Sequence, residues 1–326
     1  MTEHPLSSKM LPSELDIAAT AAILLFLAVL IGGFYLWILG RRKEKERIVN
    51  TVSVSPWSIG WVNFGLFTCT LIISVSFAQS LIAPLIGPSS AETDKIEEVD
   101  IDRETQTTER LQPSEETGSA NPAPWALVLS ILSFQIPMII AFYGLRKIYP
   151  ETFGGPLNRK SVSIREAILE TIPEFIRCFP IIWLAGLLWL ILLTGLKKLN
   201  ILDEFPPQQL LTIISSIESP LVVGLLVIFA VVLAPFVEEI IFRGAIYRFL
   251  KAETCVLNAQ IISGSLFAAV HFNLFSFLPL LVIGVLLARI YEKKGNILFP
   301  MVFHAYWNGF SLLMLLLTNW SEFSFQ

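Results

Sequence analysis

The chain has 326 residues, of which 54% are hydrophobic and only 15% charged, and its mean hydropathy is +0.67. Soluble domains carry about 25% charged residues, so this composition excludes an ordinary soluble protein and indicates a chain that a bilayer solvates. The net charge of −4 and the lack of a nucleic-acid-binding motif argue against a nucleic-acid partner. We expect an all-α, polytopic bundle of about eight transmembrane helices in the cell (inner) membrane.

Eight apolar runs account for this expectation. A helix rises 1.5 Å per residue, so about 20 apolar residues cross the ~30 Å hydrocarbon core. The runs cover residues 17–39, 59–86, 125–145, 179–196, 221–237, 260–273, 275–290 and 297–317. The first run follows an acidic start and is too long for a signal sequence, so we expect an anchor that is retained. The sixth and seventh runs are short and close together.

Basic residues in the connecting segments predict the orientation of the bundle. Most of them follow the first, third and seventh runs, at Arg41, Arg42, Lys43, Arg146, Lys147, Arg159, Lys160, Arg289, Lys293 and Lys294. Basic loops stay in the cytoplasm, so we expect both chain ends on the other side of the membrane. Lys197 and Lys198 are exceptions to this pattern.

An acidic segment interrupts the hydrophobic pattern between the second and third runs. Residues 91–120 hold ten acidic and three basic residues and no aromatic residue. This composition is typical of a solvated, disordered loop. We therefore divide the chain into an N-terminal membrane helix pair at 1–87, an acidic extracytoplasmic loop at 88–123 and a membrane helix bundle at 124–326.

Charged residues inside an apolar helix are the first candidates for function, because each costs about 2.5–3.5 kcal/mol to insert. They collect at the end of the fifth run, at Glu238, Glu239 and Arg243. Residues four apart share a helix face, so we expect Glu239 and Arg243 to form a supporting ion pair. Glu238 points elsewhere and is available as a general base. The simpler alternative places both glutamates at a helix end among lipid headgroups.

Two of the three histidines, His271 and His304, lie in apolar helices, whereas His4 lies in a polar tail. A lone buried histidine is more often a core residue than a catalyst, but these two follow the glutamates closely. Asn308 lies one helical turn beyond His304, where it can fix the imidazole tautomer or donate a hydrogen bond to an oxyanion. Alternatively, Asn308 holds two helices together.

A carboxylate, two imidazoles and an amide in a low-dielectric bundle suit hydrolysis. Glu238 and one histidine can activate a water, while the other histidine and Asn308 stabilise the tetrahedral intermediate. Alternatively, Glu238, His271 and His304 are three ligands of a catalytic zinc ion with one open position. The residue pattern does not choose between zinc and no cofactor.

These residues resemble the CPBP family, which comprises type II CAAX prenyl endopeptidases and bacteriocin-processing or immunity (Abi) proteins. The family pattern EExxxR, FxxxH and HxxxN is matched in order, within about residues 220–315, by Glu238-Glu239-xxx-Arg243, Phe267-xxx-His271 and His304-xxx-Asn308. The resemblance implies an intramembrane endopeptidase, built around this protease-like core, that cuts membrane-bound protein or peptide substrates near their C-terminus.

The resemblance also implies a role for each site residue. Glu238 and His271 would activate water, and His304 with Asn308 would form the oxyanion site. Glu239 and Arg243 would support them. The family is described both as metalloproteases and as metal-free glutamate proteases, and we favour the metal-free mechanism.

Two other functions fit parts of the pattern. A non-catalytic immunity factor or scaffold of the same fold would keep the motifs without turnover. A proton or ion carrier would also bury carboxylates and histidines. Against a carrier, the polar groups gather at one place, and the matching broken helices of transporters are not evident.

The depth of the site residues adds one condition on the fold. Residue counting places Glu238 near the cytoplasmic end of its helix and His271 deeper in the bilayer. For these groups to meet, we expect the fifth helix to continue past Arg243 toward Leu250 and to be tilted or shifted.

Overall fold

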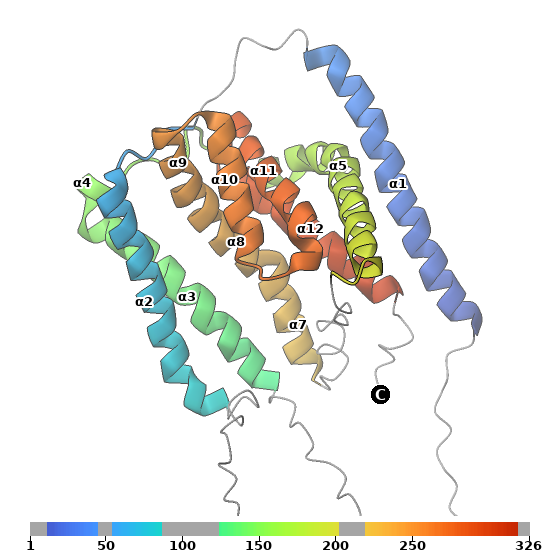
Figure 1. Cartoon of the computed structure of the whole chain (residues 1–326), viewed down its shortest axis with the longest axis horizontal. Helices are drawn as coiled ribbons and strands as arrows, with labels where there is room; N and C mark the ends of the chain where they lie inside the picture. Colours follow the sequence, from blue (N-terminus) through green and yellow to red (C-terminus); the bar gives the residue numbers. More distant parts are fainter. Residues whose placement is uncertain (1–11, 45–53, 87–123, 202–218, 319–326) are drawn as a thin grey trace, which may run out of the picture.

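The computed structural model describes residues 12–44, 54–86, 124–201 and 219–318, and these residues form helices and connecting segments without a strand. The helices are α1 (Pro12–Glu44), α2 (Gly60–Ile86), α3 (Pro124–Ile148), α4 (Pro150–Phe153), α5 (Ile164–Lys198), α7 (Pro220–Ile228), η1 (Phe229–Leu233), α8 (Ala234–Glu239), η2 (Ile240–Tyr247), α9 (Arg248–Glu253), α10 (Val256–Ala269), η3 (Leu274–Ser276), α11 (Phe277–Lys294) and α12 (Leu298–Thr318). Figure 1 shows one bundle in which the chain runs back and forth between two ends. The start of α1 and the end of α12 lie at the same end of the bundle, which agrees with the expected topology.

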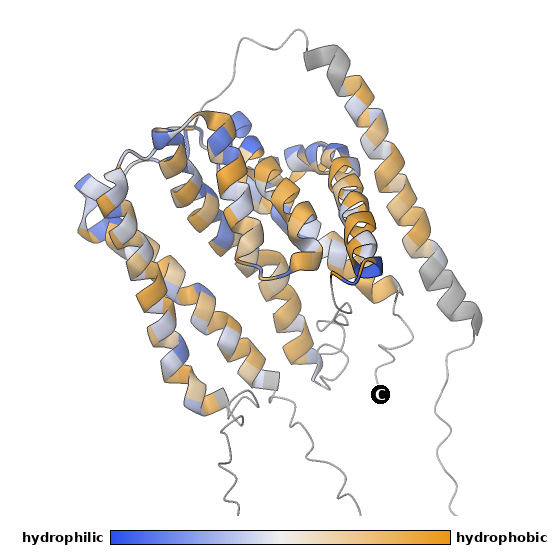
Figure 2. Cartoon of the chain, viewed as in Figure 1, coloured by the Kyte–Doolittle hydropathy of each residue, from blue (hydrophilic) through white to orange (hydrophobic). Residues whose placement is uncertain are grey.

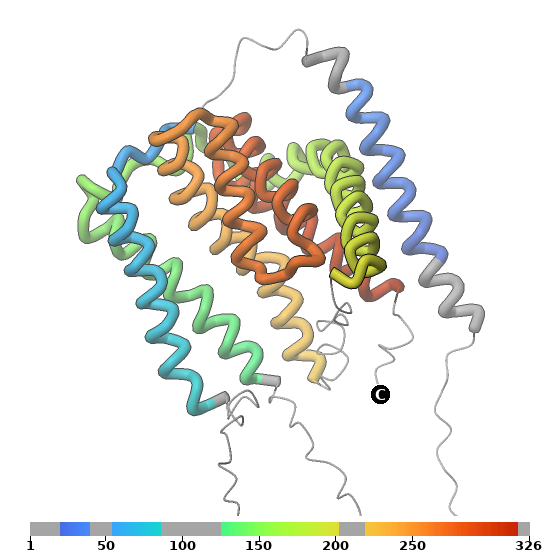
Figure 3. The backbone as a smooth tube through the Cα atoms, viewed as in Figure 1, coloured from blue at the N-terminus to red at the C-terminus, as the bar shows by residue number. Residues whose placement is uncertain are grey.

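Seven helical segments in the described ranges are long and apolar enough to cross a membrane. The remaining apolar helix, α10, corresponds to the sixth predicted run. It has only 14 residues and rises about 21 Å, which is less than the hydrocarbon thickness. The predicted polytopic all-α bundle is therefore confirmed, with one of the eight runs too short to span. Figures 1 and 3 show that the connection from α10 to α11 turns back part-way along the bundle, short of the level that α2, α3 and α7 reach.

The distribution of hydropathy agrees with a membrane protein. Figure 2 shows mostly apolar residues along the helices and a concentration of hydrophilic residues at the end where α4, α9 and the start of α5 lie. Large apolar side chains such as Ile73, Phe77 and Leu85 on α2 are more than 60% exposed, as lipid-facing residues are. The described part of the chain is thus an integral membrane protein that crosses the bilayer several times.

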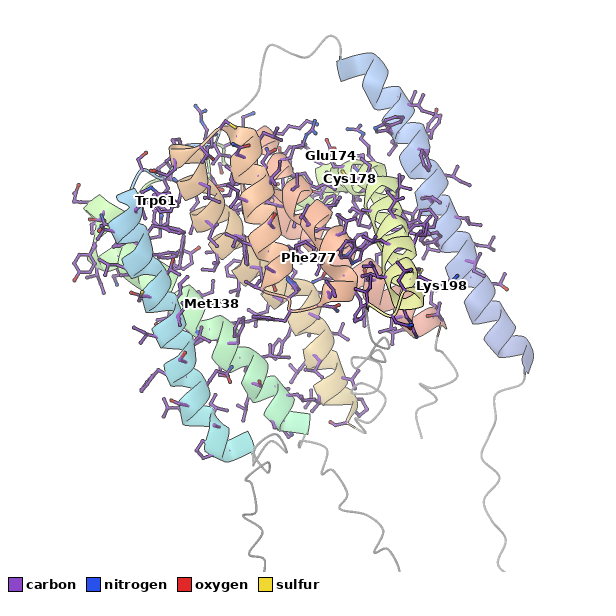
Figure 4. All side chains as sticks on the ribbon, viewed as in Figure 1. Trp61, Met138, Glu174, Cys178, Lys198 and Phe277 are labelled. Carbon is purple, nitrogen blue, oxygen red and sulfur yellow. The ribbon has the colours of Figure 1, made fainter. Side chains whose placement is uncertain are left out.

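Helix α5 is much longer than the sequence predicted. The apolar run suggested a start at residue 179, but the helix begins at Ile164, after Ser163 accepts a hydrogen bond from the backbone of Glu166. Hydropathy missed these turns because they are amphipathic and carry charges that pair with the end of α11, as Glu174 does with Lys293 at 3.1 Å. Figure 4 shows Glu174 and Lys198 toward opposite ends of this helix.

The fifth predicted run continues past the site residues, as expected. It forms one helical segment from Pro220 to Glu253, although the backbone widens to π-helical geometry in η1 and in η2. Short π-helical stretches inside α-helices are frequent at functional sites. Here they flank α8, which carries Glu238 and Glu239.

The two N-terminal helices are consecutive in the chain but lie apart in the structure. Figures 1 and 3 show α1 and α2 on opposite sides of the bundle. Helix α1 packs against α5 and α12, whereas α2 packs against α3. The predicted acidic loop at 88–123 lies outside the described residues.

The segment 54–59, which precedes α2, crosses the end of α9, and we call it the strap. The backbone N–H of Trp57 donates to the carbonyl of Arg248 at 2.9 Å. In return, Arg248 Nε donates to Ser55 and Lys251 Nζ donates to Val54, at 2.8 and 2.7 Å. These bonds join the start of the α2–α3 pair to the helix that carries the glutamates.

Helices α10 and α11 form the tightest helix pair near the site. A Cβ atom added at Gly284 would lie 2.7 Å from the Cα atom of Gly264. Small residues allow two helix backbones to approach in a membrane. Glycine at these two positions therefore sets how closely α10 lies against α11.

Candidate active site

The centre of the site is a buried ion pair between Glu239 and Arg243. Both side chains are fully buried, and Arg243 Nη1 lies 2.8 Å from Glu239 Oε1. Arg243 Nη2 donates a second hydrogen bond to the carbonyl of Gly284 on α11, at 2.9 Å. The ion pair expected from the four-residue spacing is therefore present. It also joins the α8–η2 segment to the α10–α11 hairpin.

His304 contacts the same carboxylate from helix α12. Its Nδ1 atom lies 3.0 Å from Glu239 Oε1, and its side chain is only 4% exposed. A carboxylate paired with arginine is an acceptor, so Nδ1 carries the proton of this hydrogen bond. The opposite ring nitrogen, Nε2, then faces Glu238 Oε2 at 3.9 Å. The spacing of residues along the chain did not predict the contact between Glu239 and His304.

Glu238 differs from its neighbour in both exposure and bonding. Its side chain is 25% exposed, although its Oε2 atom is itself buried and has no hydrogen-bond partner in the described residues. Glu239 also has one oxygen without a partner there, Oε2, but its Oε1 atom binds both Arg243 and His304. The distance of 3.9 Å to His304 is too long for a hydrogen bond, but contacts of this length are often bridged by a water. Adjacent glutamates on one helix thus occupy different environments, one structural and one accessible.

His271 lies just after the C-terminal end of α10, in the turn that leads to η3. Its Nδ1 atom lies 2.7 Å from the carbonyl of Phe267, and a carbonyl only accepts hydrogen bonds. Nδ1 therefore carries the proton, and Nε2 of the neutral ring is an acceptor that points away from this bond. The side chain is exposed, and among described residues it forms no ion pair with a carboxylate.

Phe267 connects the charged residues of the site with both histidines. Its ring is fully buried and lies 4.7 Å from the His271 ring and 5.5 Å from the His304 ring, measured between centroids. The guanidinium of Arg243 lies over the same ring at 4.7 Å, a distance typical of a cation–π contact. In the sequence, Phe267 stands out only as part of the FxxxH motif, and these contacts with charged and imidazole groups were not predicted.

Asn308 lies away from the carboxylates in this structure. Its Nδ2 atom donates to the backbone carbonyl of Ala230 in η1, at 2.8 Å. This is a contact between two helices, which is the alternative that the sequence left open for Asn308. It lies on the same side of α12 as His304, since four residues separate them.

A zinc site would need Glu238, His271 and His304 to meet at one point. The described residues contain no group of three His, Cys, Asp or Glu side chains that could hold one metal ion. Glu238 and His304 approach each other, but His271 does not join them. The side chains as placed do not fit the three-ligand site that the sequence allowed.

The fold and the site together define a multi-pass helical membrane protein with a buried Glu–Arg–His cluster. The family model described as type II CAAX prenyl endopeptidase Rce1-like matches residues 220–310, the segment that carries all three motifs. The chain is also 27% identical over 204 residues to the Bacillus subtilis (strain 168) protein named "Putative membrane peptidase YdiL", and the match covers 62% of this chain and 76% of that protein. No solved structure matches the chain. These comparisons support a membrane protease of the CPBP family, as the motifs predicted.

Proposed function

We propose that this protein is an intramembrane endopeptidase that hydrolyses peptide bonds of membrane-associated proteins. The observation that carries the proposal is the contrast between two adjacent glutamates. Glu239 is fully buried and bonded to Arg243 and His304. The side chain of Glu238 is partly exposed, and its ionic contact among the described residues is the 3.9 Å approach to His304. Of the two side chains, only that of Glu238 has exposed surface.

Glu238 is the general base in this proposal. It removes a proton from a water that lies between its Oε2 atom and His304, and the resulting hydroxide adds to the substrate carbonyl. The protonated Glu238 then gives the proton to the leaving amine, so that the carboxylate is restored. A carboxylate with no structural partner is free to cycle between these two states.

His304 stabilises the tetrahedral intermediate. The carboxylate of Glu239 accepts a hydrogen bond from Nδ1–H, and in this proposal the protonated ring donates its Nε2–H toward the reacting atoms. A charge-assisted hydrogen bond of this kind, fixed before the reaction, is an effective oxyanion donor. This role agrees with the family resemblance and is supported by the orientation of the ring.

The part of the proposal that concerns His271 rests on the family resemblance and on its tautomer. Its Nε2 atom is an acceptor because Nδ1–H is bonded to the Phe267 carbonyl. An acceptor nitrogen suits a residue that orients the attacking water together with Glu238. For Asn308 the resemblance implies a contact with the oxyanion.

The substrate class follows from the membrane position of the site and from the descriptions of the related proteins. The turn that carries His271 lies part-way along the length of the bundle and is exposed, so a substrate held in the bilayer can reach it. The matching family model is described as a prenyl endopeptidase, and the Bacillus relative as a membrane peptidase. A membrane-bound protein or peptide is therefore the proposed substrate.

The experiment compares cell membranes that contain the wild-type protein with membranes that contain Glu238→Gln. Cleavage products are identified by mass spectrometry of protein termini. We expect products that are present with the wild-type protein and absent with the variant. The control is Glu170→Gln, which changes an exposed glutamate on α5 and should leave the products unchanged. Products that persist in Glu238→Gln, or the absence of any product that depends on the wild type, would refute the proposal.

A further inference from the structure

The turn that carries His271 contains a phenylalanine in an unusual backbone conformation. In the described part of the chain, two residues other than glycine have a positive φ angle, Asn200 at 56° and Phe272 at 48°. Each follows the end of a helix, and its backbone N–H donates to the carbonyl three residues earlier. Asparagine is common in this left-handed conformation, whereas a bulky side chain there is an outlier. The need to end the helix therefore does not explain a phenylalanine at residue 272.

Packing does not explain this phenylalanine either. The side chain of Phe272 is 95% exposed, so it contributes little to the core of the bundle. Lipid-facing residues earlier on α10, such as Leu257 and Ile261, are 60% and 44% exposed, but they lie within the helix, where the backbone is unstrained. Strained backbone conformations cluster at functional sites. The conformation of Phe272 therefore points to a function for its exposed ring.

Hydrogen bonds fix the turn on both sides of Phe272. Before it, His271 Nδ1 is bonded to a carbonyl in the last turns of α10. After it, the side chain of Asn273 accepts hydrogen bonds from two backbone N–H groups that follow, at 3.0 and 3.2 Å. Trp189 Nε1 on α5 also donates to the carbonyl of Leu274, at 2.7 Å. The ring of Phe272 is therefore presented from a backbone that is held in place, as the imidazole of His271 is.

The position of Phe272 in the chain brings it close to the reacting atoms of the proposed reaction. Consecutive Cα atoms lie about 3.8 Å apart, so Phe272 is a direct neighbour of the histidine that orients the attacking water. An extended peptide advances about 3.3 Å per residue. A substrate whose scissile carbonyl lies at His271 would therefore bring a side chain one or two positions away to the ring of Phe272.

The surroundings of Phe272 are apolar. Residues 266–276 contain no acidic or basic side chain other than His271. Val270 and Leu274, two positions on either side of Phe272, are 51% and 49% exposed. An exposed phenylalanine between two exposed aliphatic residues suits an apolar side chain and offers a charged one no partner.

We propose that Phe272 is a specificity-determining residue, whose ring contacts an apolar substrate side chain one or two positions from the scissile bond. This inference rests on the proposed peptidase function and names the side chain that the site selects. The fixed turn aims the ring at the substrate, and the left-handed backbone is the conformation in which it does so.

The test compares two synthetic peptides in the full-length protein in detergent. One spans a cleavage site found in the membrane comparison above, and the other has serine in place of the apolar residues within two positions of the scissile bond. Apolar contacts in a binding site discriminate by about tenfold or more. We expect the wild-type protein to prefer the first peptide at least tenfold in kcat/KM. Phe272→Asn should reduce this preference to less than threefold, and Phe272→Leu should keep most of it.

The melting temperature distinguishes a substrate contact from a structural role. Asparagine suits the left-handed backbone and the ring is exposed, so Phe272→Asn should melt at the wild-type temperature or above it. The control is Leu257→Ala, which truncates an exposed apolar side chain at the opposite end of α10. It should keep both the melting temperature and the peptide preference.

Each other outcome counts against the inference. A lower melting temperature for Phe272→Asn would show that the ring is structural. A preference that survives in Phe272→Asn, or that Phe272→Leu loses as completely, would show that the ring makes no apolar contact with the substrate. In these cases the wild-type protein still cleaves the first peptide, so the peptidase function stands. If the wild-type protein cleaves neither peptide, the peptidase function fails, and the inference fails with it.

Discussion

The Nδ1 atom of His304 lies 3.0 Å from Oε1 of Glu239, although 65 residues separate them in the chain. Because Arg243 binds the same oxygen, this carboxylate carries both the buried ion pair and the orientation of the imidazole. The stability of the bundle and the orientation of the His304 ring are therefore coupled at Glu239. At Glu238, the oxygen that faces His304 has no partner among the described residues. A substitution there should therefore change activity without changing stability.

The first prediction concerns Glu239→Gln, which removes the negative charge and keeps the shape. Arg243 would remain buried opposite a neutral group, and leaving one partner of a buried ion pair costs about 3–5 kcal/mol. We expect a clear fall in the melting temperature in detergent, whereas Glu238→Gln should melt like the wild type. The double variant Glu239→Leu with Arg243→Met should regain stability without activity. Equal melting of the Glu239→Gln and Glu238→Gln proteins would contradict this account.

The second prediction compares two phenylalanines at the end of α10. Phe267 is fully buried against both histidines, whereas Phe272 is 95% exposed. Replacing a buried phenylalanine with alanine costs about 3–5 kcal/mol, so Phe267→Ala should melt at a lower temperature and lose activity as well. Phe272→Ala is the matched control and should melt like the wild type. The measurement is thermal unfolding followed by tryptophan fluorescence, and a stable Phe267→Ala protein would count against the role of Phe267.

Contacts between residues close together in the chain could be predicted from the sequence, whereas contacts between distant helices could not. The bond between Glu239 and Arg243 spans one helical turn, so the spacing alone predicted it. The bond between Glu239 and His304 depends on how α12 packs against α8, which no local pattern specifies. The bond from Asn308 to Ala230 also joins two distant parts of the chain, and the sequence allowed such a contact between helices only as one of two alternatives.

The helices of the fold could likewise be predicted where a local pattern defines them, but not where their packing decides. Long apolar runs predicted the spanning helices because membrane depth fixes their length. The first turns of α5 escaped detection because Glu170 and Glu174 lower the hydropathy there, while their ion pairs with α11 stabilise the helix. The separation of α1 from α2 could not be predicted, because both are apolar helices that could pack against many neighbours.

The third prediction tests the close contact of α10 with α11. A Cβ atom at residue 264 would lie 2.9 Å from the backbone nitrogen of Val285, so Gly264→Ala must push the helices apart. Overpacking of this kind costs about 1–3 kcal/mol, and it should also disturb the bond from Arg243 to Gly284. Gly186→Ala on α5 is the control, because nothing lies within 4 Å of its added Cβ atom. We expect lower activity and a lower melting temperature for the first variant only; equal behaviour of the two would argue against the contact.

The strap at residues 54–59 has a consequence for how the protein is made. Its partners Arg248 and Lys251 lie 193 and 197 positions later in the chain. A ribosome adds about 5–20 residues per second, so the strap is synthesised roughly 10–40 s before these partners exist. Helix α2 therefore enters the bilayer before the contacts that fix its leading end are available. This end of the bundle is completed only when the helix that carries the glutamates has been inserted, so this helix completes the packing of the helices that precede it in the chain.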